Sequence, residues 1–385
     1  MFRKMPVLLL ILIAGIVLLT PHMPLDIKQG FYAVSLTIKN LIVLVLPVII
    51  FALLFKTAVM LSNKATKIIG LILILVCCSN FFSTLLSHFI GSWVYSFDLQ
   101  MIKPNAISGL APLWTFDFPT FISNDKAMFS SIILGIILPR FYPLQSMNLA
   151  KRIEQFIEKV LKGTIFIVPL FIIGFIVKLQ HDGVMGVIVK DYATIFTIIA
   201  LAQYGYILIL YLLVSQGCVA KFINHVKGML PAAMCGFSTM SSAASMPLTI
   251  MGVQNGAKNK DLARSVVPAT VNIHLIGDCF AIPIFAYAVL KSFGIEEPSF
   301  YSYLIFAFYF MLAKFSVAAI PGGGIIVMLP ILDAYLGFSG EMMSLITALY
   351  ILFDPVITSA NIFGNGAFAK LMDRCLSTML YKKTG

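Results

Sequence analysis

The segment Ala348–Ala367, ALYILFDPVITSANIFGNGA, decides how this chain is interpreted. It is apolar enough to lie in the hydrocarbon core of a membrane, yet it carries Asp354, Thr358, Asn361 and Asn365. Their spacing of four, three and four residues places them along one face of a helix. An ionisable side chain at that depth costs several kcal/mol, so it normally faces a cavity or a partner. The pattern predicts a helix that forms the floor of a binding site; the alternative is a polar seam that joins this helix to its neighbours.

Composition places the whole chain in a membrane. Of its 385 residues, 60% are hydrophobic and only 11% are charged, whereas roughly a quarter of the residues of a soluble domain are charged. The formal net charge of +11 could suit nucleic acid, but the basic residues cluster between apolar runs, as residues that set membrane topology do. The sequence therefore predicts an all-α integral protein of the plasma membrane (the inner membrane of a bacterium), surrounded by lipid and without a nucleic-acid partner.

Apolar runs and interrupted segments together predict eight transmembrane helices and two re-entrant helical hairpins. The expected spans lie near residues 6–20, 36–61, 68–95, 127–137, 163–179, 193–214, 268–284 and 348–367, and a basic amphipathic segment at 140–162 precedes the fifth. Lysine and arginine gather in the connections on one side of this arrangement, which predicts cytoplasmic N- and C-termini.

Two segments are expected to enter the membrane and return on the same side. Phe222–Val253 is broken by Pro231, Gly236 and Pro247, and Leu304–Leu336 is broken by the stretch PGGG at 321–324. Each half is too short to span the hydrocarbon core, and non-helical backbone at that depth must be buried or line a cavity. Two such segments, each followed by a helix with polar residues, are typical of inverted-repeat secondary transporters. The alternative is two ordinary helices kinked at glycine.

The segment Pro268–Ile284, PATVNIHLIGDCFAIPI, lies between these two interrupted segments. Asn272, His274 and Asp278 stand in otherwise apolar sequence, and Pro283 disfavours a regular helix. His274 and Asp278 are four residues apart, within reach of each other on one helical face. We expect either a buried pair that steadies the helix, or an unwound segment that offers carbonyls to a cation or relays protons.

These motifs, in their order along the chain, resemble the dicarboxylate/amino acid:cation symporter family, the glutamate-transporter homologues, with this chain as a divergent member. The resemblance covers essentially the whole chain and rests on four stretches: STMSSAASMP at 238–247, ATVN at 269–272, AIPGGG at 319–324 and DPVITSANIFG at 354–364. It implies a homotrimer with an elevator-type mechanism. Residues 1–67 (spans one and two) and 98–190 (the outer loop and spans four and five) would form a static scaffold. Residues 68–97 (span three) and 191–385 would form the transport domain.

The resemblance also implies roles for single residues. Serines of the first hairpin and Asn361 would bind a substrate carboxylate, Asp354 would pair with an amino group, and the glycines at 322–324 would form the outer gate. The implied substrate-binding residues are Ser241, Ser242, Gly322, Gly323, Gly324, Asp354, Ile357, Thr358 and Asn361. The implied residues for cation binding or proton relay are Ser79, Asn272, His274, Asp278, Lys314, Asn361 and Asn365, with sodium possible at Asn272, Asn361 and Asn365. No cofactor is expected besides the transported cation.

Several departures from the family pattern concern the substrate and the coupling ion. Acidic-substrate members carry an arginine three residues after the aspartate, where this chain has Ile357, and a second arginine of some members corresponds to Met240. Asn365 stands where a cation-binding aspartate is usual, and the Asn-Met-Asp-Gly-Thr motif becomes NIHLIGD at 272–278, two residues longer. Lys314 falls where backbone carbonyls usually hold sodium, so its ammonium either takes the place of an ion or snorkels to the outer interface.

The sequence predicts a secondary active symporter rather than an enzyme, because no Ser-His-Asp, metal-ligand or nucleotide motif occurs in it. It would couple H+ or Na+ flux to uptake of a small carboxylate-bearing solute, with a neutral amino acid favoured and sodium dependence weak or absent. An acidic amino acid or a C4-dicarboxylate, held by Lys314, is the alternative within transport. A membrane-embedded substrate sensor or an anion-conducting channel is the alternative from another class.

Overall fold

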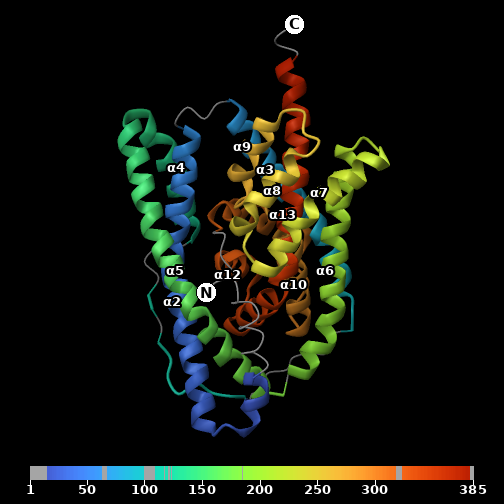
Figure 1. The fold of residues 1–385 in the computed structure, drawn as a ribbon. Coiled ribbons are helices and arrows are strands. Elements are labelled where there is room, and N and C mark those ends of the chain that lie inside the picture. The colour runs from blue at the N-terminus through green and yellow to red at the C-terminus, as the bar shows by residue number, and fades with distance from the viewer. Residues whose placement is uncertain are drawn as a thin grey trace.

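The computed structural model describes residues 15–62, 67–98, 109–116, 118–119, 122, 124–183, 185–317 and 323–381, and every regular element within these ranges is helical (Figure 1). Three of the described helices contain stretches long and apolar enough to cross a membrane: Gly70–Tyr95, Tyr192–Val214 and Gly340–Cys375. The all-α fold class and its apolar helices are therefore those of an integral membrane protein. The expected first span, 6–20, lies mostly outside the described residues.

Three helices pack against one another on one side of the molecule, at the left of Figure 1. They are α2 (Leu25–Ser62), α4 (Asn124–Phe141) and α5 (Pro143–His181). A small apolar cluster that includes Phe55 and Ala150 lies between them. Because α4 and α5 both pack along α2, this group has a small interior of its own, while other residues of α2 and α5, among them Tyr32 and Ile176, belong to the larger core.

The larger core is built around two helices, α10 (Ile276–Ser292) and α13 (Gly340–Tyr381). Every residue of α10 from Ile276 to Leu290 is buried. α13 contacts α10 and also most of the other helices in this part of the molecule. The surrounding elements are α3 (Lys67–Tyr95), α6 (Met185–Val214), α7 (Val219–Thr239), α8 (Ser242–Gln254), α9 (Lys260–Thr270), α11 (Phe300–Ala313) and α12 (Gly323–Leu336), with short 3-10 turns η2 (Thr20–His22) and η3 (Lys314–Ser316). Residues of the polar face of α13 therefore lie in the middle of this group.

The first interrupted segment breaks at one place only. Pro231 lies inside α7 and Pro247 inside α8, and the two helices separate at Met240 and Ser241. Met240 has the left-handed φ of 49° that ends α7, and the Ser241 hydroxyl accepts the backbone N–H of Ala244 to begin α8. The expectation of breaks at Pro231, Gly236 and Pro247 is wrong, since all three lie inside continuous helices. Membrane helices tolerate proline and glycine where the freed backbone groups find other partners.

The break near Asp278 also lies elsewhere than predicted. Pro283 is inside the regular helix α10, so the expectation that it would disrupt helix there is wrong. The interruption is Val271–Leu275, between α9 and α10. The helix accommodates Pro283, although proline removes a backbone N–H and crowds the carbonyl four residues before it. The break falls instead at the polar residues Asn272, which lines a cavity, and His274, which bonds Ser79.

Several helices, α2 and α5 among them, are longer than the hydropathy pattern indicates. α2 begins at Leu25 rather than Leu36, directly after Pro24, which suits the start of a helix. α5 joins the amphipathic segment and the expected fifth span into one helix, since Gly163 is tolerated inside it. Hydropathy marks where a helix is apolar, and the helix itself continues until the backbone is broken.

A first expected result concerns the close approach of α2 and α5 at Gly174. A Cβ atom there would lie 2.7 Å from the backbone carbon of Phe31 and 2.7 Å from Ser35 Cβ. Gly174→Ala should lower the free energy of unfolding by about 1–3 kcal/mol, as overpacking usually does. Gly205→Ala on α6 is the control, because its added Cβ would meet nothing within 4 Å. Equal thermal unfolding temperatures of the two variants in detergent would contradict this packing.

Candidate functional site

A cavity lies where α8, α10, α12 and α13 meet beside the break at Val271–Leu275. Its lining combines hydroxyl, amide and acidic side chains with a few apolar ones: Met240, Ser242, Val271, Asn272, Leu275, Asp278, Val317, Gly324, Tyr350, Asp354, Thr358 and Asn361. The charged members are Asp278 and Asp354, both acidic. The first residue of α8, Ser242, and the second residue of α12, Gly324, bring two helix N-termini to the same cavity.

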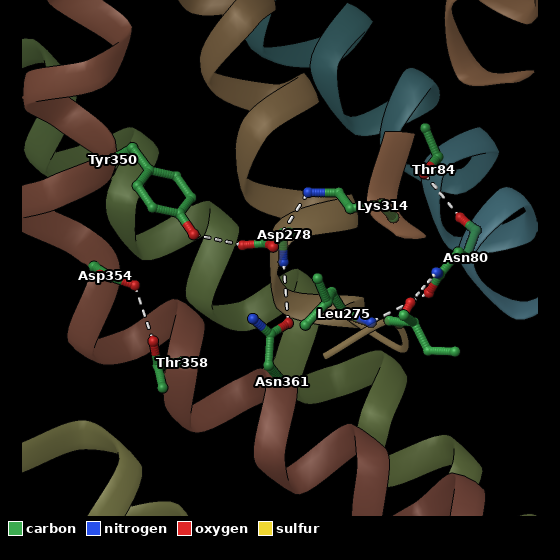
Figure 2. A network of polar contacts seen from close by, with 10 residues as sticks. Asn80, Thr84, Leu275, Asp278, Lys314, Tyr350, Asp354, Thr358 and Asn361 are labelled. Atoms are coloured by element: carbon green, nitrogen blue, oxygen red, sulfur yellow. Dashed lines mark hydrogen bonds and ion pairs between the residues drawn. The ribbon is translucent and has the colours of Figure 1, made fainter. Parts of the chain in front are cut away.

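Asp278 forms hydrogen bonds with three other residues, Lys314, Tyr350 and Asn361 (Figure 2). Lys314 donates from Nζ to Asp278 Oδ2 at 3.2 Å, and Tyr350 donates its hydroxyl to Oδ1 at 2.7 Å. The backbone N–H of Asp278 is donated to Asn361 Oδ1 at 3.3 Å. The side chain of Asp278 is 1% exposed and that of Lys314 is 0% exposed. An ion pair so fully buried is strongly destabilised when either partner is removed.

The structure decides between the two expectations for Lys314. Its Nζ is buried and lies 4.4 Å from the centre of the Phe310 ring, as well as beside Asp278. The alternative in which Lys314 snorkels to the outer interface is therefore wrong. The side chain turns inward because the partner carboxylate and the ring are within reach of its stem at the end of α11.

His274 and Asp278 do not form the expected pair. The Nε2 atom of His274 forms a hydrogen bond of 2.9 Å with Ser79 Oγ, and its ring lies 4.3 Å from that of Phe368. Asp278 has Lys314 and Tyr350 as its partners. The spacing of four residues fails here because α10 begins only at Ile276, so the two residues do not share a helix.

The broken backbone at Val271–Leu275 is held by Asn80 of α3. Its amide donates to the carbonyl of Ile273 at 2.6 Å, and its side-chain oxygen accepts the N–H of Leu275 at 3.3 Å. Buried peptide groups outside a helix need such partners. Neither Asn80 nor Tyr350 is among the residues predicted for the site. Tyr350 could have been found, because it lies four residues before Asp354 on the polar face of α13.

The predicted polar face of α13 points inward. Thr358 donates its hydroxyl to Asp354 Oδ1 at 2.9 Å, and Asp354 is only 3% exposed. Asn361 accepts the Asp278 N–H, whereas Asn365 accepts the hydroxyl of Thr270 at 2.6 Å, away from the cavity. The face thus divides into a part that lines the cavity and a part that holds α9.

Comparison with known proteins adds an independent observation. Residues 5–375 match the sodium:dicarboxylate symporter family, which is nearly the whole chain. The chain belongs to this family. A protein of Haemophilus influenzae named "Uncharacterized symporter" is 24% identical over 263 residues, covering 64% of this chain and 59% of that protein. "Putative sodium-dependent excitatory amino acid transporter glt-4" of Caenorhabditis elegans is 26% identical over 161 residues, covering 42% of this chain and 32% of that protein. The matched segments span less than two thirds of either relative.

Of the other predicted site residues, some line the cavity and others do not. Ser242, Asn272 and Gly324 line the cavity, whereas Ser241 caps α8 and Gly323 begins α12. Gly322 lies outside the described residues. Ile357 is fully buried and is not among the cavity-lining residues. In the described part of the chain, no three His, Cys, Asp or Glu residues come together as a metal cluster would.

A second expected result concerns the hydroxyl of Tyr350. Tyr350→Phe should lower the free energy of unfolding by about 1.5–3 kcal/mol, because it removes a hydrogen bond to a charged group. Tyr211→Phe is the matched control: its buried hydroxyl donates to the neutral carbonyl of Phe363 at 2.9 Å, a bond worth about 0.5–1.5 kcal/mol. Denaturation of both variants should rank Tyr350→Phe as the more damaging. The opposite order would indicate that Tyr350 does not stabilise an ionised Asp278.

Proposed function

We propose that this protein is a secondary active symporter that couples H+ or Na+ flux to uptake of a small carboxylate-bearing solute, with a neutral amino acid fitting best. The observation that carries the proposal is the two-sided chemistry of the cavity. Helix N-termini meet it at Ser242 and Gly324, and acidic side chains line it at Asp278 and Asp354. Such a cavity complements a zwitterion.

The carboxylate of the solute would bind at the helix N-termini. The first backbone N–H groups of a helix and its dipole favour a negative charge at that end. The hydroxyl of Ser242 and the side chain of Asn361 line the same cavity and can add hydrogen bonds. The carboxylate would then lie between α8, α12 and α13.

The ammonium of the solute would bind at Asp354. This carboxylate lines the cavity from α13 and is buried, so a charged partner would interact with it in surroundings that contain little water. Thr358 fixes its position through the 2.9 Å hydrogen bond. Asp278 is less suited to this role, because Lys314 and Tyr350 already bind both of its oxygens.

A second carboxylate on the solute would meet no basic side chain. The cavity-lining residues in the described part of the chain include no arginine, lysine or histidine, and Lys314 contacts Asp278 without lining the cavity. Burial of an uncompensated charge is far more costly than burial of a neutral group. This supports a neutral amino acid over an acidic amino acid or a C4-dicarboxylate.

We also propose the division of labour that the family resemblance implies. Residues 1–67 and 98–190 would form the scaffold, and residues 68–97 and 191–385 the moving domain of an elevator-type homotrimer with cytoplasmic termini. The packing of α2, α4 and α5 against one another, around a small apolar cluster of their own, supports this division. The helix pairs α7–α8 and α11–α12 would be the two re-entrant hairpins among eight spans, since each pair packs together and contributes to the cavity.

The substrate preference can be measured directly. Protein reconstituted in vesicles should take up alanine or serine in preference to glutamate or a C4-dicarboxylate, because only the first two avoid burying a second carboxylate. Uptake should be compared under imposed pH and sodium gradients, and stabilisation of the purified protein by each solute gives an independent readout. Preferred uptake of glutamate or a dicarboxylate would show that the proposed solute class is wrong.

Removal of the Asp354 charge tests the ammonium site. Asp354→Asn keeps an oxygen that can accept the Thr358 hydroxyl, yet it should weaken amino-acid binding by about 2–5 kcal/mol, the usual cost of truncating a desolvated charge pair. Asp373→Asn is the control on the same helix, where the carboxylate accepts backbone N–H groups of Lys258 and Asn259 at 2.8 Å, away from the cavity. Calorimetry should show unchanged affinity for the control only. Equal affinity in both variants would remove Asp354 from the site.

A further inference from the structure

We propose that the ammonium of Lys314 is a built-in cation at Asp278, which compensates this carboxylate in place of an exchangeable ion, so that solute binding does not require sodium. The inference deepens the proposed function, on which it rests, because it concerns the cation use of the same site. It does not depend on which solute occupies the cavity.

The first argument is the occupancy of the Asp278 carboxylate. Lys314 binds Oδ2 at 3.2 Å and Tyr350 binds Oδ1 at 2.7 Å, so each oxygen already faces a donor. A free cation at this carboxylate would have to displace the ammonium or share the carboxylate with it. Like charges in so buried a place repel strongly, so the carboxylate would not hold both.

The second argument is that Lys314 cannot leave the site as a transported ion does. Its side chain is fully buried, and its Nζ rests 4.4 Å above the Phe310 ring, a second favourable contact for a cation. The residue stands where α11 passes into η3, so its covalent stem ties the cation to the α11–α12 pair. The charge therefore moves only with the backbone that carries it.

The third argument is the position of the ion pair on the cavity wall. Asp278 lines the cavity in the first turn of α10, and a Cβ atom added at Gly324 would lie 2.8 Å from Asp278 Oδ2. The Asp278 carboxylate thus lies where α10, α11, α12 and α13 meet. If the lysine side chain were shortened, a buried carboxylate would face a space beside the cavity that a cation from solution could enter.

The proposal predicts a gain of sodium dependence when the built-in cation is removed. Sodium chloride is exchanged for choline chloride at constant ionic strength, and the thermal unfolding temperature of the purified full chain is measured without solute. Wild type should unfold at the same temperature in both salts. Lys314→Ala should be less stable in choline and should regain stability as sodium is added. The Kd of the Lys314→Ala variant for an amino acid should fall about tenfold or more when choline is replaced by sodium, as is common for coupled sites.

Two further variants separate this role from that of an ordinary structural ion pair. Lys370→Ala removes another buried lysine, which lies on α13 and whose Nζ donates to the carbonyls of Val253 and Asn255. This variant should lose the same stability in both salts. The double variant Asp278→Asn with Lys314→Met removes both charges and should be insensitive to sodium. If Lys314→Ala does not fold in either salt, the double variant still tests the proposal, because a sodium response in it would contradict the built-in cation.

Three results would overturn the proposal: a wild-type Kd that falls steeply with sodium, a folded Lys314→Ala variant with no sodium response, or a sodium response in the double variant. The salt dependence of unfolding needs no solute, so it stands apart from the solute assignment. Failure of amino acids to bind would overturn the proposed function alone. Amino-acid binding that requires sodium in wild type would overturn only the built-in cation.

Discussion

The carboxylate of Asp278 is the constraint on which the rest of the site depends. A charge that is 1% exposed must be met by donors from the protein itself, and here they come from separate elements. Lys314 supplies the cation from the end of α11, and Tyr350 a hydroxyl from α13. The backbone N–H of Asp278 is donated to Asn361 Oδ1. These contacts place α10, α11 and α13 relative to one another, and the close approach of Gly324 adds α12.

A second requirement concerns the backbone just before Asp278. The break at Val271–Leu275 exposes peptide groups that no helix pairs, and within a membrane these groups need partners from the protein. Asn80 bonds both the Ile273 carbonyl and the Leu275 N–H, while the neighbouring Ser79 binds His274. α3 is thereby tied to the start of α10. The break also carries Asn272, which lines the cavity.

Patterns local to one helix could be predicted from the sequence, and contacts between helices could not. The spacing of Asp354, Thr358 and Asn361 predicted one inward face, because a helix fixes the relative directions of its own side chains. The depth of Lys314 depends on which residues of other helices surround it, so the sequence left two alternatives open. Tyr350 was missed because an aromatic residue in an apolar run counts as hydrophobic until its hydroxyl meets Asp278. The family resemblance extended to the whole chain, and the matched residues 5–375 confirm it.

The built-in cation of Lys314 and the proposed neutral solute are consistent with each other on electrostatic grounds. A zwitterion brings no net charge into the cavity, so its passage through low-dielectric surroundings requires no extra cation to balance it. A dicarboxylate brings two negative charges, and the one that the helix N-termini do not bind would need a positive partner at the same depth. Lys314 cannot be that partner while it is paired with Asp278, because release of the carboxylate would leave one buried anion in exchange for another. The ion pair at Asp278 therefore favours a solute that carries its own compensating charge.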